Sequence, residues 1–157
     1  MPATAKIAAI DLERAFDECD MKKKFQEELD ADFQAKKARL QEMEKELKRI
    51  KGEMDLVTEG SEEHRNLQTQ ALHKTADLQF EAEQSEKDFK QKRAEKFKVV
   101  LDLIQRKTTE YCEAKSIDFV FQRKLTIEES MPSWESVFYH RPQFDITDDV
   151  IRLVNGT

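Results

Sequence analysis

Two long stretches of the chain repeat apolar residues at helical spacing among charged residues. In the first stretch, intervals of three and four residues separate Leu40, Met43, Leu47, Ile50, Met54 and Val57. The second stretch carries a looser series from Leu67 to Ile104. Such spacing places apolar side chains on one face of a helix. The pattern therefore predicts two long helices, one over residues 13–58 and one that continues to Tyr111.

The two apolar series are mirror images about residues 59–61. Met54 and Leu67 lie about equally far from this point, and so do Ile50 and Ala71. An antiparallel helix pair brings such residues face to face, as in a coiled coil. The predicted seam consists of Phe25, Phe33, Met43, Leu47, Ile50, Met54, Leu67, Ala71, Leu78, Phe89, Phe97 and Val100.

The residues at the mirror point fit a tight turn. Gly60 suits the C-terminus of the first helix, because glycine adopts the left-handed conformation that ends many helices. Ser61 is a good N-cap, and the acids after it favour the first turn of a helix. We therefore expect one long helical hairpin with its turn near residues 59–61.

Shorter elements are predicted on both sides of the hairpin. Residues 6–11, 117–123 and 134–140 have the apolar or alternating character of strands, whereas residues 124–131 are ambiguous. Residues 145–156 predict a short helix that Asp145 or Thr147 could cap and that ends at Asn155-Gly156.

The predicted fold is mostly α with a small β-sheet. A two-helix pair buries one seam and no full core, so it needs an anchored base. We expect residues 1–20 and 105–157 to form an α+β body and residues 21–104 to form a coiled-coil arm. Because the apolar segments of the body exceed what one small sheet can bury, we expect the body to associate with further copies.

Composition agrees with an elongated, solvated protein. Charged residues make up 38% of the chain, against about 25% in an average protein. The net charge of −6 argues against nucleic acid as a partner. No apolar run approaches a membrane span, and residues 1–5 lack the features of a signal peptide, so a cytosolic or a trimmed exported protein is expected.

No group of residues suggests catalysis, a cofactor or a metal. His64 and His73 are nine positions apart on one predicted helix and point to different sides. The three glycines of the chain are too scattered for a phosphate-binding loop. Cys19 and Cys112 are expected to be small apolar residues that do not form a disulfide with each other. The protein is therefore not expected to be an enzyme.

Charge alternates in blocks along the predicted arm. The turn region contains Glu53, Asp55, Glu59, Glu62 and Glu63 and no Lys or Arg between residues 52 and 64. The simplest interpretation of such blocks is a solvated face, and the alternative is a surface that contacts a partner. The candidate basic contact residues are Lys36, Lys37, Lys45, Lys48, Lys51, Lys87, Lys90 and Lys92.

Three stretches give the chain a resemblance to the Skp/OmpH family of periplasmic chaperones. They are KIAAIDLERAF at residues 6–16, IDFVFQ at 117–122 and FDITDDVIRLVN at 144–155. The resemblance implies a homotrimer whose three arms surround a cavity and hold unfolded outer-membrane β-barrel proteins without ATP. It also implies a periplasmic location. Well-studied members are basic, whereas this chain is acidic, which argues against membrane association.

On this view the body sets the oligomeric state. The predicted oligomerisation residues are Ile7, Ile10, Phe119, Phe121, Val137, Tyr139, Val150, Ile151 and Val154. The alternative function is a structural coiled-coil adaptor or spacer that docks one folded partner. Binding of many unfolded clients would favour the chaperone, and binding of one folded partner would favour the adaptor.

Overall fold

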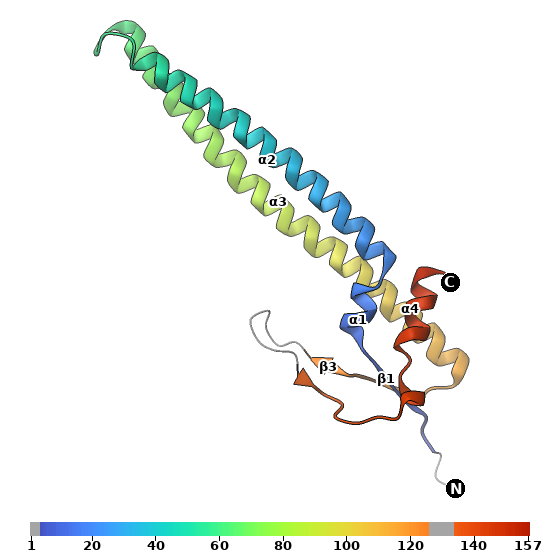
Figure 1. Cartoon of the computed structure of the whole chain (residues 1–157). Coiled ribbons are helices and arrows are strands. Elements are labelled where there is room, and N and C mark those ends of the chain that lie inside the picture. The colour runs from blue at the N-terminus through green and yellow to red at the C-terminus, as the bar shows by residue number, and fades with distance from the viewer. Residues whose placement is uncertain (1–3, 126–133) are drawn as a thin grey trace. The chain divides into compact units, whose positions relative to one another are not determined.

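The structure is a computed structural model that describes residues 4–125 and 134–157 (Figure 1). It divides into two compact units. We call Met1–Gln26 with Glu95–Thr157 the terminal unit and Glu27–Ala94 the hairpin unit. The elements in chain order are β1 (Ile7–Ile10), α1 (Leu12–Asp17), α2 (Asp20–Met54), α3 (Glu62–Lys115), β2 (Phe119–Gln122), β3 (Lys124–Leu125), β4 (Trp134–Glu135), the 3-10 helix η1 (Pro142–Phe144) and α4 (Thr147–Asn155). The prediction of a mostly helical chain with a small sheet is confirmed.

Within the hairpin unit, α2 and α3 run antiparallel side by side (Figure 1). The rings of Phe33 and Phe89 meet at 5.6 Å between centroids, as the mirror pattern predicts. Nearer the turn, Ile50 and Ala71 are buried. A cross-helix ion pair joins Lys74 to a residue of α2, Glu46, at 3.0 Å. The fold-back of the chain is therefore confirmed.

The turn begins earlier than the sequence predicts. Helix α2 ends at Met54 and not at residue 58. Residues 55–58 include an Asp, a Val and a Thr, which are weak helix formers. Gly60, with φ of 78°, lies in a separate turn that the Ser61 N–H closes on the Thr58 carbonyl at 3.1 Å. Gly60 is thus not the C-cap of the first helix, and that prediction was wrong.

Ser61 caps the second long helix as predicted. Its Oγ accepts the N–H of His64 at 3.1 Å, which satisfies one of the free donors at the start of α3. Helix α3 then continues without interruption to Lys115, slightly beyond the predicted end at Tyr111.

The first predicted helix is broken between Asp17 and Asp20. Helix α1 begins at Leu12 after Asp11, whose Oδ1 accepts the N–H of Arg14 at 3.0 Å. Across the break, Asn155 of α4 accepts the Asp20 N–H at 2.9 Å and donates to the Glu18 carbonyl at 3.0 Å. One remote amide group thus satisfies backbone groups on both sides of the break, which explains why local sequence gives no sign of it.

Strand β1 makes backbone contacts on both of its edges in the terminal unit. It pairs in parallel with β2, so that Ile7 lies beside Phe119 and Ala9 beside Phe121. On its other edge the Ala9 carbonyl accepts the N–H of Ile146 at 3.0 Å. The N-terminal strand is therefore held between two segments that follow the hairpin in sequence.

The predicted strand over residues 134–140 is mostly absent. Only Trp134–Glu135 forms a strand, β4, which pairs antiparallel with β3. Beyond it, the N–H groups of Ser136 and Val137 both turn to the Arg123 carbonyl, and the Ser136 hydroxyl donates to the Gln122 carbonyl. These bonds take the chain out of the ladder, so the aromatic alternation there did not predict the structure. Residues 126–131 of the ambiguous segment lie outside the described residues.

Alternation along β1 separates the core from an outer face. Ala8 and Ile10 point inward and join a buried cluster with Val100, Ile104 and Val150. Cys19 belongs to this cluster and Cys112 packs against it, and both thiols are free. The small core therefore draws on β1, α3 and α4 together.

A buried hydroxyl links the ends of the terminal unit. Thr147 Oγ1 accepts the N–H of Asp11 at 2.9 Å and donates to Asp145 Oδ1 at 2.5 Å. Asp145 also accepts the N–H of Thr147, the first residue of α4, and a bond from Arg123. The N-cap residue of α4 is Ile146, which makes no side-chain cap bond, so neither Asp145 nor Thr147 is the cap that the sequence predicts. Burial would raise the pKa of Asp145, but the Thr147 hydrogen bonds and the Arg123 charge hold it below its usual value.

The break between α1 and α2 should depend on Asn155. Replacing it by alanine in Asn155→Ala removes both bonds and should lower the free energy of unfolding by about 1 kcal/mol, the usual value of a helix cap. Hydrogen exchange should accelerate at the Asp20 amide. The control is Asn66→Ala on the exposed face of α3, where alanine should be neutral or slightly stabilising. Equal exchange at Asp20 in both variants would contradict this role.

The hydrogen bond between Tyr111 of α3 and Asp149 of α4 predicts that this tyrosine ionises only at high pH. Tyr111 donates to Asp149 Oδ2 at 2.6 Å, and this bond, with burial, raises the pKa of Tyr111 to about 12 from 10.0. Because the folded state holds the proton more tightly, the stabilisation is complete below pH 10 and is lost as the pH rises towards 12. In a Tyr139→Phe background, ultraviolet absorbance should show a phenolate midpoint near 12, and Asp149→Asn should lower it. A midpoint near 10 with Asp149 intact would contradict the assignment.

Candidate functional site

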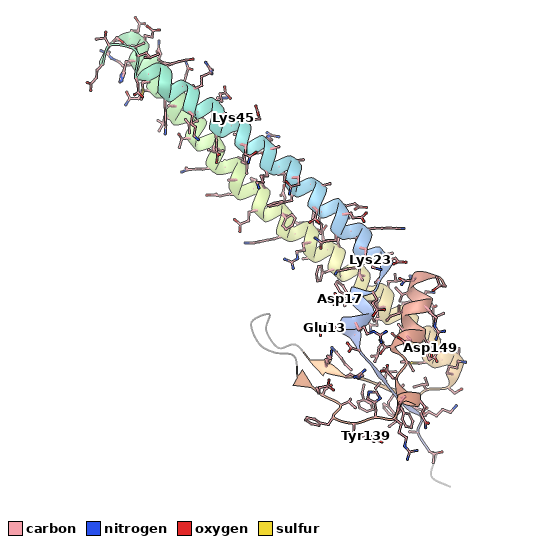
Figure 2. All side chains as sticks on the ribbon, in the orientation of Figure 1. Glu13, Asp17, Lys23, Lys45, Tyr139 and Asp149 are labelled. Carbon is pink, nitrogen blue, oxygen red and sulfur yellow. The ribbon has the colours of Figure 1, made fainter. Side chains whose placement is uncertain are left out.

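The outer face of the β1–β2 sheet is an exposed apolar surface. Parallel register places Ile7, Phe119 and Phe121 together on it, with exposed fractions of 48%, 59% and 52%. Tyr139, labelled in Figure 2, is 82% exposed. It shares with Ile7 and Phe121 the wall of a pocket of about 230 Å³. We call these four residues the sheet face. Aromatic side chains this open on a small domain are typical of an interaction surface.

The structure divides the predicted oligomerisation residues into two groups. The sheet face is exposed, whereas Ile10 and Val150 are buried, and Ile151 and Val154 pack against the same core. Val137 is half-buried beside the sheet face. The exposed group offers the most open apolar surface to a second chain. The sequence could not separate the groups, because their composition is the same and the distinction depends on sheet register.

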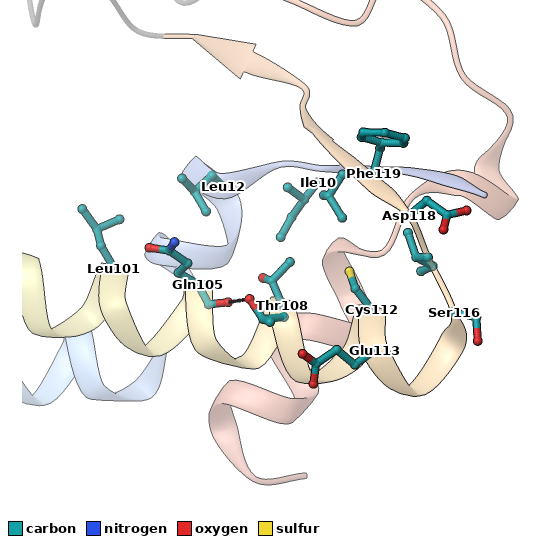
Figure 3. Close-up of a pocket in the computed structure, with 13 residues that line it drawn as sticks. Ile10, Leu12, Leu101, Gln105, Thr108, Cys112, Glu113, Ser116, Asp118 and Phe119 are labelled. Atoms are coloured by element: carbon teal, nitrogen blue, oxygen red, sulfur yellow. Dashed lines mark hydrogen bonds between the residues drawn. The ribbon is translucent and has the colours of Figure 1, made fainter. Parts of the chain in front are cut away.

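A second apolar surface in the terminal unit is a groove of about 720 Å³. Figure 3 shows Leu101, Gln105 and Cys112 of α3 on one side and residues of the β1–α1 and β2 segments on the other. Burial raises the pKa of the Cys112 thiol, which favours its protonated form. The groove therefore offers apolar contact and an unreactive thiol.

The candidate basic residues also fall into distinct environments. Lys92 bonds to Asp32 at 3.2 Å, and Lys36 lies 3.6 Å from both Asp32 and Asp88. The Lys92 bond lowers the pKa of Asp32. These two lysines pair with acids across α2 and α3, so they are already engaged within the hairpin unit.

The remaining candidate lysines are exposed. Lys45 and Lys90 pair with acids of their own helix, Glu42 and Glu86. Among the described residues, no ion pair involves Lys37, Lys48, Lys51 or Lys87. These four retain their charge for contact with a partner, and neither their sequence positions nor their spacing distinguished them from Lys36 and Lys92.

The acidic turn region shows no sign of a metal site. In residues 4–125 and 134–157, no three His, Cys, Asp or Glu residues are grouped so that they could hold an ion. Glu53 pairs with Arg49 at 2.6 Å. Over the same part of the chain, no helix combines the length and the apolar character that crossing a membrane requires.

Sequence reasoning missed several exposed apolar side chains on α3. Leu72 and Phe80 are 70% and 63% exposed, and Leu101 is 41% exposed. Leu72 follows the seam residue Ala71, and Phe80 lies two positions after the seam residue Leu78. A second series at helical spacing, offset from the seam, was the signal that could have identified them.

Comparison with known proteins decides the family. The sequence model of the family described as outer membrane protein (OmpH-like) matches residues 6–154. The chain belongs to the OmpH-like family. This is a family of chaperones and not of enzymes. The predicted family and the prediction that the protein is not an enzyme are both confirmed.

A solved OmpH-like structure has the same fold. It is a crystal structure from Caulobacter crescentus CB15, assigned as an OmpH-like outer membrane chaperone, with 16% sequence identity and a TM-score of 0.82. The match covers 99% of this chain and 87% of the other. No curated protein matches the chain. At this identity the likeness shows that the two proteins share a fold over nearly the whole chain.

Proposed function

We propose that this OmpH-like chain is an ATP-independent holdase that binds unfolded outer-membrane β-barrel proteins in the periplasm. In the proposal, three copies associate through the sheet face, and the three hairpin units hold the client between them. The observation that carries it is the sheet face, whose four apolar side chains, three of them on paired strands, are between 48% and 82% exposed. Family membership supports the client class.

The sheet face supports self-association better than client binding. Ile7, Phe119 and Phe121 project from two paired strands, so these three side chains are positioned before any contact is made. The inward residues of the same strands already fill the core of the terminal unit. A regular, preorganised apolar face fits a second copy of itself, whereas unfolded clients of many sequences have no fixed shape to match it.

The hairpin unit supports weak and multiple client contacts. Its seam is narrow, and most of its surface is charged and solvated. A tight single site could not release clients of differing sequence, but three hairpin units that each bind weakly reach useful avidity together. Lys37, Lys48, Lys51 and Lys87 are the basic residues of this proposal.

Disruption of the sheet face should dissociate the assembly. Phe121→Ser should raise the concentration of half-dissociation by about tenfold or more, because an apolar contact worth roughly 1.5–3 kcal/mol is lost. Light scattering gives the mass, and circular dichroism checks that the helices remain. The control is Leu153→Ser, which alters a 41% exposed leucine of α4. A wild-type monomer at micromolar concentration, or a trimer that survives Ile7→Ser with Phe119→Ser and Phe121→Ser, would overturn the assembly.

If the protein is a holdase, it should prevent aggregation of an unfolded client without added nucleotide. The protein should suppress light scattering when a urea-unfolded outer-membrane β-barrel protein is diluted into buffer, at micromolar trimer. The dissociated Phe121→Ser variant should protect less, because avidity is lost. An intact trimer without protection would overturn the holdase. Binding of one folded partner in fixed ratio would then favour the adaptor.

A further inference from the structure

The side of α3 opposite the seam carries its own apolar series within the hairpin unit. Leu72, Ala76 and Phe80 are spaced four residues apart, and all three are exposed. Seam residues such as Ala71 and Leu78 face the other way, towards α2. We call Leu72, Ala76 and Phe80 the α3 stripe. It is one residue wide, and further along α3 come Glu83 and then Lys87.

The stripe is too small for a folded partner. Its two large side chains expose at most about 300 Å² together, whereas a stable protein–protein interface buries about 800 Å² on each side. The residues beside it include His73, Asp77 and Gln79, which would remain solvated. The partner that fits so narrow an apolar line is a single extended chain.

The spacing of the stripe matches that of an extended polypeptide. Residues four apart on a helix are separated by about 6 Å along its axis. Alternate residues of an extended chain, which point to the same side, are about 6.7 Å apart. Over the roughly 12 Å from Leu72 to Phe80 the mismatch accumulates to only about 1 Å. Three alternate apolar side chains can therefore meet the three stripe residues in turn.

The nearest cation beyond the stripe on this face of α3, Lys87, favours a partner that carries a negative charge. Lys87 lies about 10 Å beyond Phe80, the length of about three extended residues. It is exposed, and no ion pair involves it within the described part of the chain. A carboxylate two to four residues after the last apolar side chain would reach its ammonium group.

We infer that the α3 stripe with Lys87 binds extended segments in which apolar residues alternate and an acidic residue follows. The inference deepens the proposed function and rests on it, because it specifies which client segments the hairpin unit recognises. Alternation of apolar and polar residues is the sequence signature of membrane β-barrel strands. An anionic membrane surface is the weaker candidate partner, because the chain has a net charge of −6 and an acidic turn region.

Synthetic peptides test the pattern directly. A labelled nonapeptide with valine or phenylalanine at positions 1, 3 and 5 and aspartate at positions 7 and 9 should bind the intact protein, as followed by fluorescence anisotropy. A peptide of the same composition with its three apolar residues consecutive should bind several-fold more weakly, because neighbouring side chains of an extended chain point to opposite sides. Replacing the aspartates by lysine should also weaken binding.

Variants of the exposed face test the residues. Leu72→Ser and Phe80→Ser should each weaken binding of the alternating peptide by about fivefold, as expected for loss of a partly buried apolar contact. Lys87→Glu should weaken binding of the aspartate peptide and strengthen binding of the lysine peptide. The matched control is Lys24→Glu, which makes the same charge change at an exposed position of α2 outside the proposed client-contact residues and should not reverse the preference.

The outcomes separate this inference from the holdase. Equal binding of both apolar patterns, or no effect of Leu72→Ser and Phe80→Ser, overturns the α3 contact even when aggregation is suppressed. If the wild-type protein does not suppress aggregation, the proposed function is wrong. The peptide measurements still show whether the α3 stripe binds extended segments. If the two serine variants reduce co-sedimentation with phosphatidylglycerol vesicles and leave peptide binding unchanged, the partner is a membrane surface and the inference is wrong.

Discussion

The terminal unit depends on hydrogen bonds that join residues far apart in sequence to strand β1 and the residue after it. The bond from the Asp11 N–H to the Thr147 hydroxyl closes a separation of 136 positions. Bringing such residues together is unfavourable for a flexible chain. The antiparallel hairpin reduces the problem, because α3 returns the chain alongside α2 and makes the sheet partners of β1 available. Sheet, core and sheet face thus all follow from the fold-back that the seam encodes.

The seam itself is only partly apolar, and charge completes it. Ion pairs join Asp32, Lys36, Asp88 and Lys92, and Asp32 and Asp88 are the sequence neighbours of Phe33 and Phe89, whose rings meet. Exposed ion pairs contribute little to stability, but like charges in the wrong register are unfavourable. The cluster therefore acts more on the register of the hairpin than on its strength. A seam of this kind leaves the outer faces of both helices free to evolve.

Sequence reasoning predicted the features that arise from local periodicity. The mirror of the two apolar series predicted the hairpin, and Ser61 predicted the cap of α3, because these signals involve neighbouring residues. The break before Asp20 could not be predicted, since its partner Asn155 is remote. Strand β4 was overestimated because Ser136 and Val137 bond to Arg123. Which of Ile7 and Ile10 is exposed depends on the face of the strand that each occupies. The α3 stripe was not predicted, because its apolar residues recur with the same helical period as the seam.

The contacts of β1 on both of its edges have a consequence for biosynthesis. A ribosome adds about 5–20 residues each second, from the N-terminus onwards. Lys6 precedes its partner Asp118 by 112 positions, so β1 waits roughly 6–22 s for its first strand partner. During that time its backbone and Ile7, Ala8, Ala9 and Ile10 are open to any neighbouring strand. Strand β1 has only four residues and is flanked by the charges of Lys6 and Asp11. Short length and flanking charge are features that disfavour pairing of an open strand with other chains.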